Sequence, residues 1–124
     1  MNLSQEQPAG INVPVDLAAA LRWVDGDRAL LAELIEIFIE DCPPKIQELD
    51  QAVKEGNADR VRRAAHSLKG MVAGFDATSA QGLAKEMEDL GTAGDLSNTV
   101  RLFSALQLEF TRVIHHLKAA NCNE

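Results

Sequence analysis

One histidine lies on the polar side of an amphipathic segment, where an imidazole can do chemistry. Apolar residues recur in this segment at helical spacing: Val61, Ala65, Leu68, Val72 and Phe75. At roughly 100° per residue, His66 lies about 140° from this stripe and points at water. Gly70 and Ala73, one and two turns on, are too small to cover the ring. Because a glycine costs a helix about 1 kcal/mol, the pattern indicates a histidine displayed for a macromolecular partner.

Positive charge gathers around this histidine. Arg60, Arg62, Arg63 and Lys69 fall within a stretch that contains no acid, although the chain has a net charge of −7. Lys69 lies one turn from His66 on the same side of the helix, so its role would be electrostatic. A solvated helix face accounts for most charge runs of this kind. A basic patch beside an exposed histidine also fits a partner with an acidic surface.

The predicted neighbour of the histidine comes from the next helix along the chain. An antiparallel pair that turns near residues 75–77 brings together residues whose numbers sum to about 152. His66 then lies opposite residues 85–88, where Glu88 is one position from the inward-facing Met87. A carboxylate that accepts from one ring nitrogen would fix the tautomer and leave the other nitrogen free as a nucleophile. An ordinary solvated glutamate fits the pattern equally well. Lys85 lies in the same stretch and is equally expected to be close to His66.

Other chemistries find little support in the residue pattern. A di-iron bundle site needs two Glu-x-x-His motifs, but the residues three before His66, His115 and His116 are arginine or valine. His115 and His116 are adjacent and cannot share a helix face, so we interpret them as solvated. A histidine kinase would need a Gly-rich nucleotide loop and an ATP-binding domain, and a hydrolase would need a nucleophile with an oriented base. The sequence contains none of these patterns.

Composition restricts the class of protein further. A chain of 124 residues with 46% hydrophobic content suits one domain with a real core. The net charge of −7 argues against nucleic-acid binding, which needs a basic surface. No apolar run approaches the ~20 residues that span a bilayer, and no secretory signal precedes the domain. Cys42 and Cys122 have no metal-type spacing, so we interpret them as reduced thiols of a cytoplasmic protein without membrane contact.

Helical periodicity without strand-like alternation predicts an all-α protein, an antiparallel four-helix bundle with a short extra N-terminal helix. We expect residues 1–14 to be a flexible lead-in or linker, 15–120 the bundle and 121–124 a tail. The predicted helices cover 16–24, 27–40, 43–56, 57–74, 77–90 and 95–117. The residues expected to face inward are Leu31, Leu34, Ile35, Phe38, Ile46, Leu49, Val53, Ala80, Leu83, Met87, Leu90, Val100, Phe103, Leu106, Phe110, Val113 and Leu117.

Caps and helix breakers set the predicted boundaries. Pro43 and Pro44 are expected to end one helix and to start the next. The cap of the histidine helix is Asn57 or Asp59, and that of the last helix is Asp95 or Ser97. The helix between them is expected to stop at Gly91 and Gly94.

A longer motif surrounds the histidine: the run His66-Ser67-Leu68-Lys69-Gly70, preceded by Arg62-Arg63-Ala64-Ala65. The flanking segments are Trp23-Val24-Asp25-Gly26-Asp27, then Leu30 to Asp41 and Pro43, Gly56-Asn57-Ala58-Asp59, and Gly94-Asp95. With this motif and these flanks, the sequence resembles histidine-containing phosphotransfer (HPt) domains, as found at the C-termini of hybrid sensor kinases. The similarity covers roughly residues 15 to 118. An isolated H-x-L-K-G motif would be weak evidence for this family. The motif together with matching register, helix count and flanks is specific evidence for it.

The resemblance implies a phosphoryl carrier of a two-component phosphorelay, without catalytic machinery or kinase activity of its own. By similarity His66 is the phosphoacceptor, Lys69 neutralises charge on the phosphoryl group, and Gly70 lets a receiver domain approach. Mg²⁺ belongs to the receiver, so this chain needs neither metal nor cofactor. The chain departs from the family at Met71, Gly74 and Asp76, and Asp76 can serve instead as the N-cap of the next helix.

The expected partners are receiver domains, and we expect the chain to be a monomer. The first helix is too short to be a fifth helix of the bundle, so we expect it to cover one end of the bundle. Because Leu17, Leu21 and Val24 cannot all be buried there, leftover apolar residues near the histidine would form a docking patch, with Leu17, Leu21 and Ala73 as candidates. Around it, Arg62 and Arg63 would face the acidic pocket of a receiver. The alternative is a helical adaptor that has the fold and binds receivers without carrying phosphate.

Overall fold

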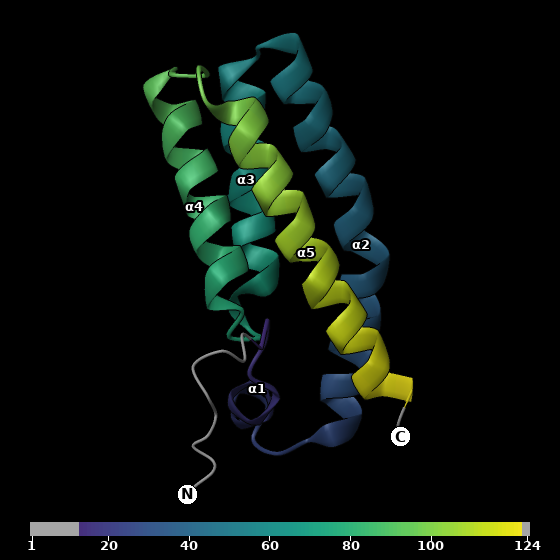
Figure 1. The fold of residues 1–124 in the computed structure, drawn as a ribbon. Coiled ribbons are helices and arrows are strands. Elements are labelled where there is room, and N and C mark those ends of the chain that lie inside the picture. The colour runs from purple at the N-terminus through teal and green to yellow at the C-terminus, as the bar shows by residue number, and fades with distance from the viewer. Residues whose placement is uncertain (1–12, 123–124) are drawn as a thin grey trace, which may run out of the picture.

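The chain forms an antiparallel four-helix bundle with a short helix across one end (Figure 1). The computed structural model describes residues 13–122. Its helices are α1 (Leu17–Trp23), α2 (Arg28–Glu55), α3 (Ala58–Ala73), α4 (Thr78–Ala93) and α5 (Thr99–Cys122). The predicted fold class is confirmed. Most of the predicted lead-in and part of the tail lie outside the described residues, while positions 121 and 122 belong to α5.

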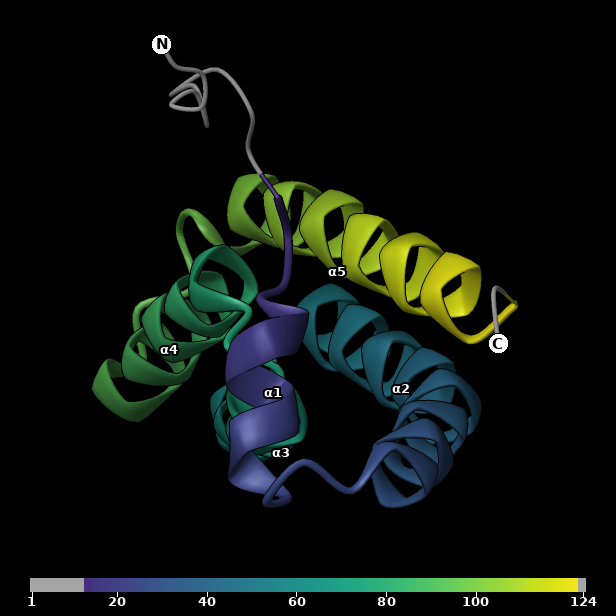
Figure 2. The ribbon, with the colours of Figure 1, turned by 90° about the horizontal axis from the view of Figure 1, so that it is seen from below.

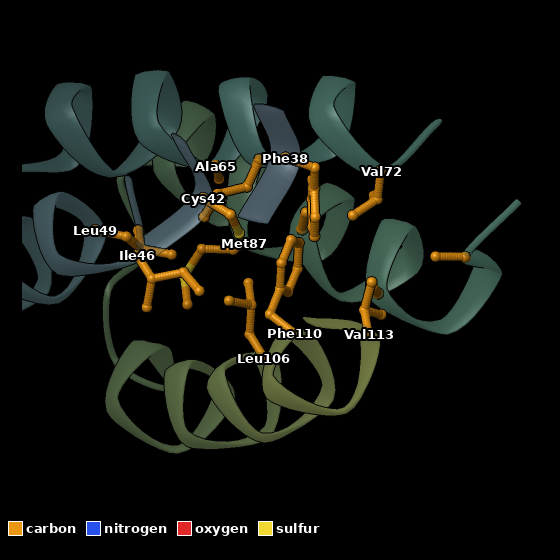
Figure 3. Close-up of a cluster of buried hydrophobic side chains, with 14 of the residues drawn as sticks. Phe38, Cys42, Ile46, Leu49, Ala65, Val72, Met87, Leu106, Phe110 and Val113 are labelled. Carbon is orange, nitrogen blue, oxygen red and sulfur yellow. The ribbon is translucent and has the colours of Figure 1, made fainter. Parts of the chain in front are cut away.

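Each bundle helix packs against two neighbours, in the cyclic order α2, α3, α4, α5, and α2 closes the ring against α5. Side chains from all four helices meet on the bundle axis (Figure 3). The largest fully buried side chains are Phe110, Leu49, Leu68, Met87, Leu106 and Leu117. With 28 and 24 residues, α2 and α5 are longer than α3 and α4, which have 16 each. They therefore extend past the α3–α4 hairpin, at the end where α1 lies (Figure 1).

α2 is one continuous helix, so the predicted break at Pro43 and Pro44 is wrong. A proline cannot donate its backbone hydrogen bond and typically costs a helix interior ~3 kcal/mol. Both prolines are exposed. The buried residues of α2 meanwhile continue through this point at helical spacing: Ile35, Phe38, Cys42, Ile46, Leu49 and Val53. Burial of this unbroken stripe against the rest of the bundle outweighs the local cost of the prolines.

Asn57, rather than Asp59, caps α3: its Oδ1 accepts a hydrogen bond from the backbone N of Arg60 at 3.1 Å. The predicted Asp76 cap of α4 is wrong. Asp76 adopts the left-handed region with φ 53°, and the cap residue Ala77 makes no side-chain hydrogen bond. The helix is thus held by packing rather than by its cap, since Ala77 is fully buried.

Gly91 does not stop α4 but lies buried inside it, and the helix ends at Gly94 with φ 72°. A Cβ added at Gly91 would lie 2.7 Å from the backbone N of Arg62 and 2.9 Å from the carbonyl oxygen of Ala58. Such distances are far below van der Waals contact, so only glycine lets α3 and α4 approach here. Gly91 therefore fixes the packing of the two helices that carry the histidine and its predicted neighbour.

The last turn before α5 is built differently from the prediction. α5 begins at Thr99, beyond both predicted caps. Asp95 Oδ1 accepts hydrogen bonds from the backbone N of Ser97 at 3.2 Å and from its hydroxyl at 2.7 Å. These bonds lower the pKa of Asp95. The two residues thus stabilise the connecting turn rather than the helix start.

The residue that caps α1 is hydrogen-bonded to the turn between α3 and α4. This cap residue, Asp16, accepts from the backbone N of Ala19 at 3.1 Å, and its own backbone N donates to the carbonyl oxygen of Phe75 at 3.1 Å. The ring of Phe75 packs edge-on against Phe38 of α2, with centroids 5.4 Å apart. Seen along the bundle, α1 crosses the end of α3 (Figure 2). α1, α2 and the end of α3 therefore meet at one end of the molecule.

Most of the predicted inward residues are buried, and Leu31, Leu83 and Leu90 are half-buried. Two predictions are wrong: Leu34 is 38% exposed and Val100 is 70% exposed. Leu34 lines an open apolar groove between α1, α2 and the end of α3 and is therefore not fully covered. At the start of α5, the neighbouring Thr99 is buried in place of Val100.

Candidate functional site

His66 lies near the middle of α3 on its solvent side, and its side chain is 65% exposed. Gly70 and Ala73, which follow on the same side, are exposed as well. A Cβ added at Gly70 would meet no atom within 4 Å. The imidazole therefore stands above an open stretch of helix that the surface of another protein can approach closely.

Glu88 of α4 lies beside the imidazole, within the stretch 85–88 that antiparallel pairing predicts opposite His66. Its Oε2 lies 2.8 Å from Nδ1 of His66, and its side chain is only 17% exposed. Because an ionised carboxylate can only accept, Nδ1 carries the proton in this contact. In the described part of the chain, Nε2 of His66 has no hydrogen-bond partner. When the ring is neutral, its lone pair therefore lies on Nε2 and faces solvent.

Lys69 shares the same carboxylate, a contact that the sequence did not predict. Its Nζ lies 2.7 Å from Oε1 of Glu88, and its side chain is 26% exposed. The ammonium of Lys69, more than the hydrogen bond with His66, holds the pKa of Glu88 below its usual range. Glu88 is therefore ionised at neutral pH and joins a lysine and a histidine one turn apart on α3. Helical periodicity places His66 and Lys69 on the same side of α3, but the ion pair of Lys69 with Glu88 depends on side-chain rotamers, which periodicity does not report.

The other basic residues near the site are paired with acids. Lys85, the alternative neighbour of the histidine, has its Nζ 3.0 Å from Asp89 Oδ1, which raises the pKa of the lysine. Arg62 and Arg63 both bind Asp59, at 3.0 and 2.9 Å, and together lower its pKa. Asp59 immediately precedes the acid-free stretch, so the basic patch has less net charge than the sequence suggests.

An apolar groove of about 420 Å³ lies beside Gly70, between α1, α2 and α3. Its lining residues are Ala20, Trp23, Val24, Leu31, Leu34, Ile37, Phe38, Asp41, Gly70, Met71, Gly74 and Phe75. Trp23 is 73% exposed and Ile37 52% exposed. Clusters of exposed apolar side chains of this kind mark interaction surfaces. Two of the departures from the family pattern, Met71 and Gly74, fall in this lining and leave the imidazole untouched.

The structure does not bring Leu17 and Leu21 to this groove. Both are half-buried and line a separate cavity with α2 and the end of α5. Of the three apolar residues of α1 and its C-cap considered for the patch, Val24 does line the groove beside Gly70, together with Trp23. Trp23 is not among the docking residues predicted from the sequence. A large aromatic residue off the apolar stripe of a short helix is nevertheless a recognisable signal for such a surface.

The described residues contain no group of three or more His, Cys, Asp or Glu side chains arranged to hold a metal ion. His115 and His116 line a shallow pocket of α5 with Pro14 and Leu108. Cys42 is buried in the core, and burial raises the pKa of its thiol to about 12. Across positions 13–122, no helix combines the length and apolar character that crossing a membrane requires.

Comparison with known proteins places this geometry in a family. Residues 33–116, more than half of the chain, match the Hpt domain family, and the chain therefore belongs to it. The fold is similar to the crystal structure of histidine-containing phosphotransfer protein B (HptB) from Pseudomonas aeruginosa PAO1, with a TM-score of 0.83. That match covers 90% of this chain and 96% of the other, at 23% sequence identity. No curated protein matches the sequence. The chain is thus an Hpt domain of the two-component phosphorelay family.

Proposed function

We propose that His66 carries a phosphoryl group between receiver domains. The lone pair of Nε2 attacks the phosphorus of a receiver's aspartyl phosphate, and the P–O bond breaks with its electron pair left on the aspartate carboxylate. In onward transfer, a carboxylate oxygen of a second receiver attacks phosphorus, and the electrons of the N–P bond return to Nε2. Nδ1 keeps its proton in both steps, so the chain needs no general base of its own.

One observation supports this proposal above the others: the contact of Nδ1 with Glu88 at 2.8 Å on an otherwise exposed ring. The contact orients the imidazole and selects the tautomer with a free lone pair on Nε2. The free nitrogen stands on a helix face that Gly70 leaves open. A buried structural histidine would instead have both nitrogens satisfied within the protein.

In this proposal Lys69 and Gly70 have separate roles. Lys69 supplies positive charge as the phosphoryl group arrives, because its ammonium lies one turn from His66 and is held there by the ion pair with Oε1 of Glu88. Gly70 and the groove beside it provide the docking surface for the receiver. Arg62 and Arg63 add charge that speeds encounter with an acidic partner and weakens with salt. The receiver supplies the Mg²⁺ that the transfer needs.

Labelled phosphotransfer distinguishes this function from that of an adaptor. A set of receiver domains is phosphorylated with radiolabelled phosphate, mixed with the chain and sampled over time. A carrier gains label from at least one receiver and then passes it to a second, unlabelled receiver. Receivers that bind the chain firmly and never give it label would contradict the proposal and support the adaptor.

A further inference from the structure

We propose that Asp41 makes the apolar groove beside Gly70 selective for receiver domains that place a lysine or an arginine against it. This inference rests on the receiver docking of the proposed function and names which receivers the surface accepts. Asp41 is a specificity-determining residue in this scheme, because it touches the partner and takes no part in phosphoryl transfer.

Asp41 is the one charged residue among the twelve described residues that line the groove. Its side chain is exposed, and in the part of the chain that the structure describes its carboxylate makes no hydrogen bond or ion pair. Lys45, one turn further along α2, binds Glu48 instead, at 3.1 Å. The groove therefore combines an apolar lining with a negative charge that awaits a cation from outside.

The backbone beside Asp41 adds a hydrogen-bond acceptor. In a helix each N–H donates to the carbonyl oxygen four positions earlier, but Pro44 has no N–H to give to Glu40. Both of these residues are exposed. The carbonyl oxygen of Glu40 consequently lacks its helical donor immediately before Asp41. A lysine ammonium or an arginine guanidinium has donors enough for both acceptors.

Docking turns this arrangement into selectivity. A receiver that covers the groove removes water from the Asp41 carboxylate, and burial of an unpaired carboxylate is costly. A lysine or arginine of the receiver replaces that cost by a charge-assisted hydrogen bond. Receivers with an apolar or acidic side chain at this place are therefore disfavoured, and specificity is the difference between the two affinities.

The charges of the docking face also fix the orientation of the receiver. α3 packs between α4 and α2. Lys69 of α3 contacts Glu88 on the α4 side, whereas Asp41 lies on the α2 side, at the groove. Charges of opposite sign thus stand on the two sides of Gly70. A receiver fits them when its acidic pocket faces the lysine and its cation faces Asp41.

Asp41→Asn tests the selectivity through binding. Affinities for a set of receiver domains are measured by titration calorimetry for the parent and the variant, and circular dichroism confirms that the helices are kept. Receivers that bind the parent tightly should bind the variant about tenfold more weakly, because a charged pair becomes a neutral hydrogen bond. Receivers that bind the parent weakly should keep or gain affinity, so the differences among receivers narrow.

Glu33→Gln is the matched control, because it removes the same charge from an exposed residue of α2 that does not line the groove. It should rank the receivers as the parent does. In the receiver that binds tightest, each lysine and arginine around its phosphorylation pocket is then replaced in turn by glutamine. One replacement should weaken binding to the parent about tenfold and leave binding to Asp41→Asn unchanged.

Two results would overturn the role of Asp41. One is a ranking of receivers by Asp41→Asn that equals the ranking by the parent, and the other is a receiver in which no cation couples to Asp41. Label on His66 in the same mixtures would then leave the carrier function standing. Receivers that show the coupling and never label His66 would overturn the carrier function, while the role of Asp41 in binding would stand.

Discussion

Three side chains from two helices form the site as one charge-balanced unit. Glu88 binds the imidazole of His66 through one oxygen and the ammonium of Lys69 through the other. The helix spacing of α3 places the histidine and the lysine one turn apart, so a single carboxylate reaches both. In the proposed function, the same residues orient the nucleophile and hold a positive charge close to the place where the phosphoryl group would arrive.

Lys69→Ala should slow transfer from a phosphorylated receiver by tenfold or more. The effect of one such electrostatic contact is about 2–4 kcal/mol in a closed site, which is an upper limit here because the site opens to solvent. Stability should fall by less than about 1 kcal/mol. Lys85→Ala removes a lysine paired on α4 and should leave the rate unchanged. Equal transfer rates for Lys69→Ala and the parent would remove Lys69 from the mechanism.

The lowered pKa of Glu88 also connects the site to acid stability. A glutamate in an unfolded chain has a pKa of about 4.3, and Lys69 holds that of Glu88 lower in the folded protein. Its stabilisation is therefore complete above the unfolded pKa and disappears as pH falls through the folded pKa. We expect Glu88→Gln to lose less stability than the parent between pH 6 and pH 3. Urea unfolding followed by circular dichroism at both pH values tests this, and an equal loss would contradict it.

At the scale of elements, helix packing decides where the sequence pattern succeeds and where it fails. The turn between α3 and α4 predicts Glu88 beside His66, because short antiparallel pairs keep their register over a few turns. The pattern fails at Pro43 and Gly91 for one reason. Proline and glycine preferences are local, whereas the buried stripe of α2 and the contact of α3 with α4 are tertiary. The pair between Lys69 and Glu88 depends on side-chain rotamers, which periodicity does not report.

Two glycines of α4 offer a matched test of this packing. Gly91→Ala places a Cβ against the backbone of α3, so we expect a loss of stability of about 1–3 kcal/mol. At Gly82 the added Cβ meets nothing within 4 Å, so Gly82→Ala should be neutral or stabilise by up to about 1 kcal/mol. Thermal and urea unfolding of both variants provide the measurement. Equal effects at the two positions would contradict the close approach of α3 and α4.

At the scale of the whole molecule, one end of the bundle combines the histidine face with an apolar groove. α2 extends past the α3–α4 hairpin (Figure 1), and an apolar groove stays open between α1, α2 and α3. Trp23 and Ile37 consequently remain exposed next to Gly70. Part of this surface could be predicted, since a short first helix leaves apolar residues uncovered. The choice of Trp23 over Leu17 and Leu21 depends on how α1 is rotated against α2 and α3, which the sequence pattern of so short a helix does not determine.

Gly70→Gln tests whether this end is the docking surface. Glycine is the weaker helix former and its site is open, so the variant should melt at or above the temperature of the parent. We expect it to bind receivers poorly and still to react slowly with phosphoramidate, which needs no docking. Gly82→Gln, an exposed glycine on α4, should bind like the parent. Normal binding and transfer by Gly70→Gln would mean that the glycine is merely tolerated.

Identification of the phosphorylated residue is the sharpest test of the proposed phosphoryl carrier. The parent, His66→Gln and His115→Gln are each incubated with a labelled, phosphorylated receiver, and the label on the chain is tested for acid lability and base stability. Circular dichroism confirms that each variant keeps its helical content. We predict acid-labile, base-stable label on the parent and on His115→Gln, as a phosphoramidate requires, and none on His66→Gln. Label that persists in folded His66→Gln would contradict the account.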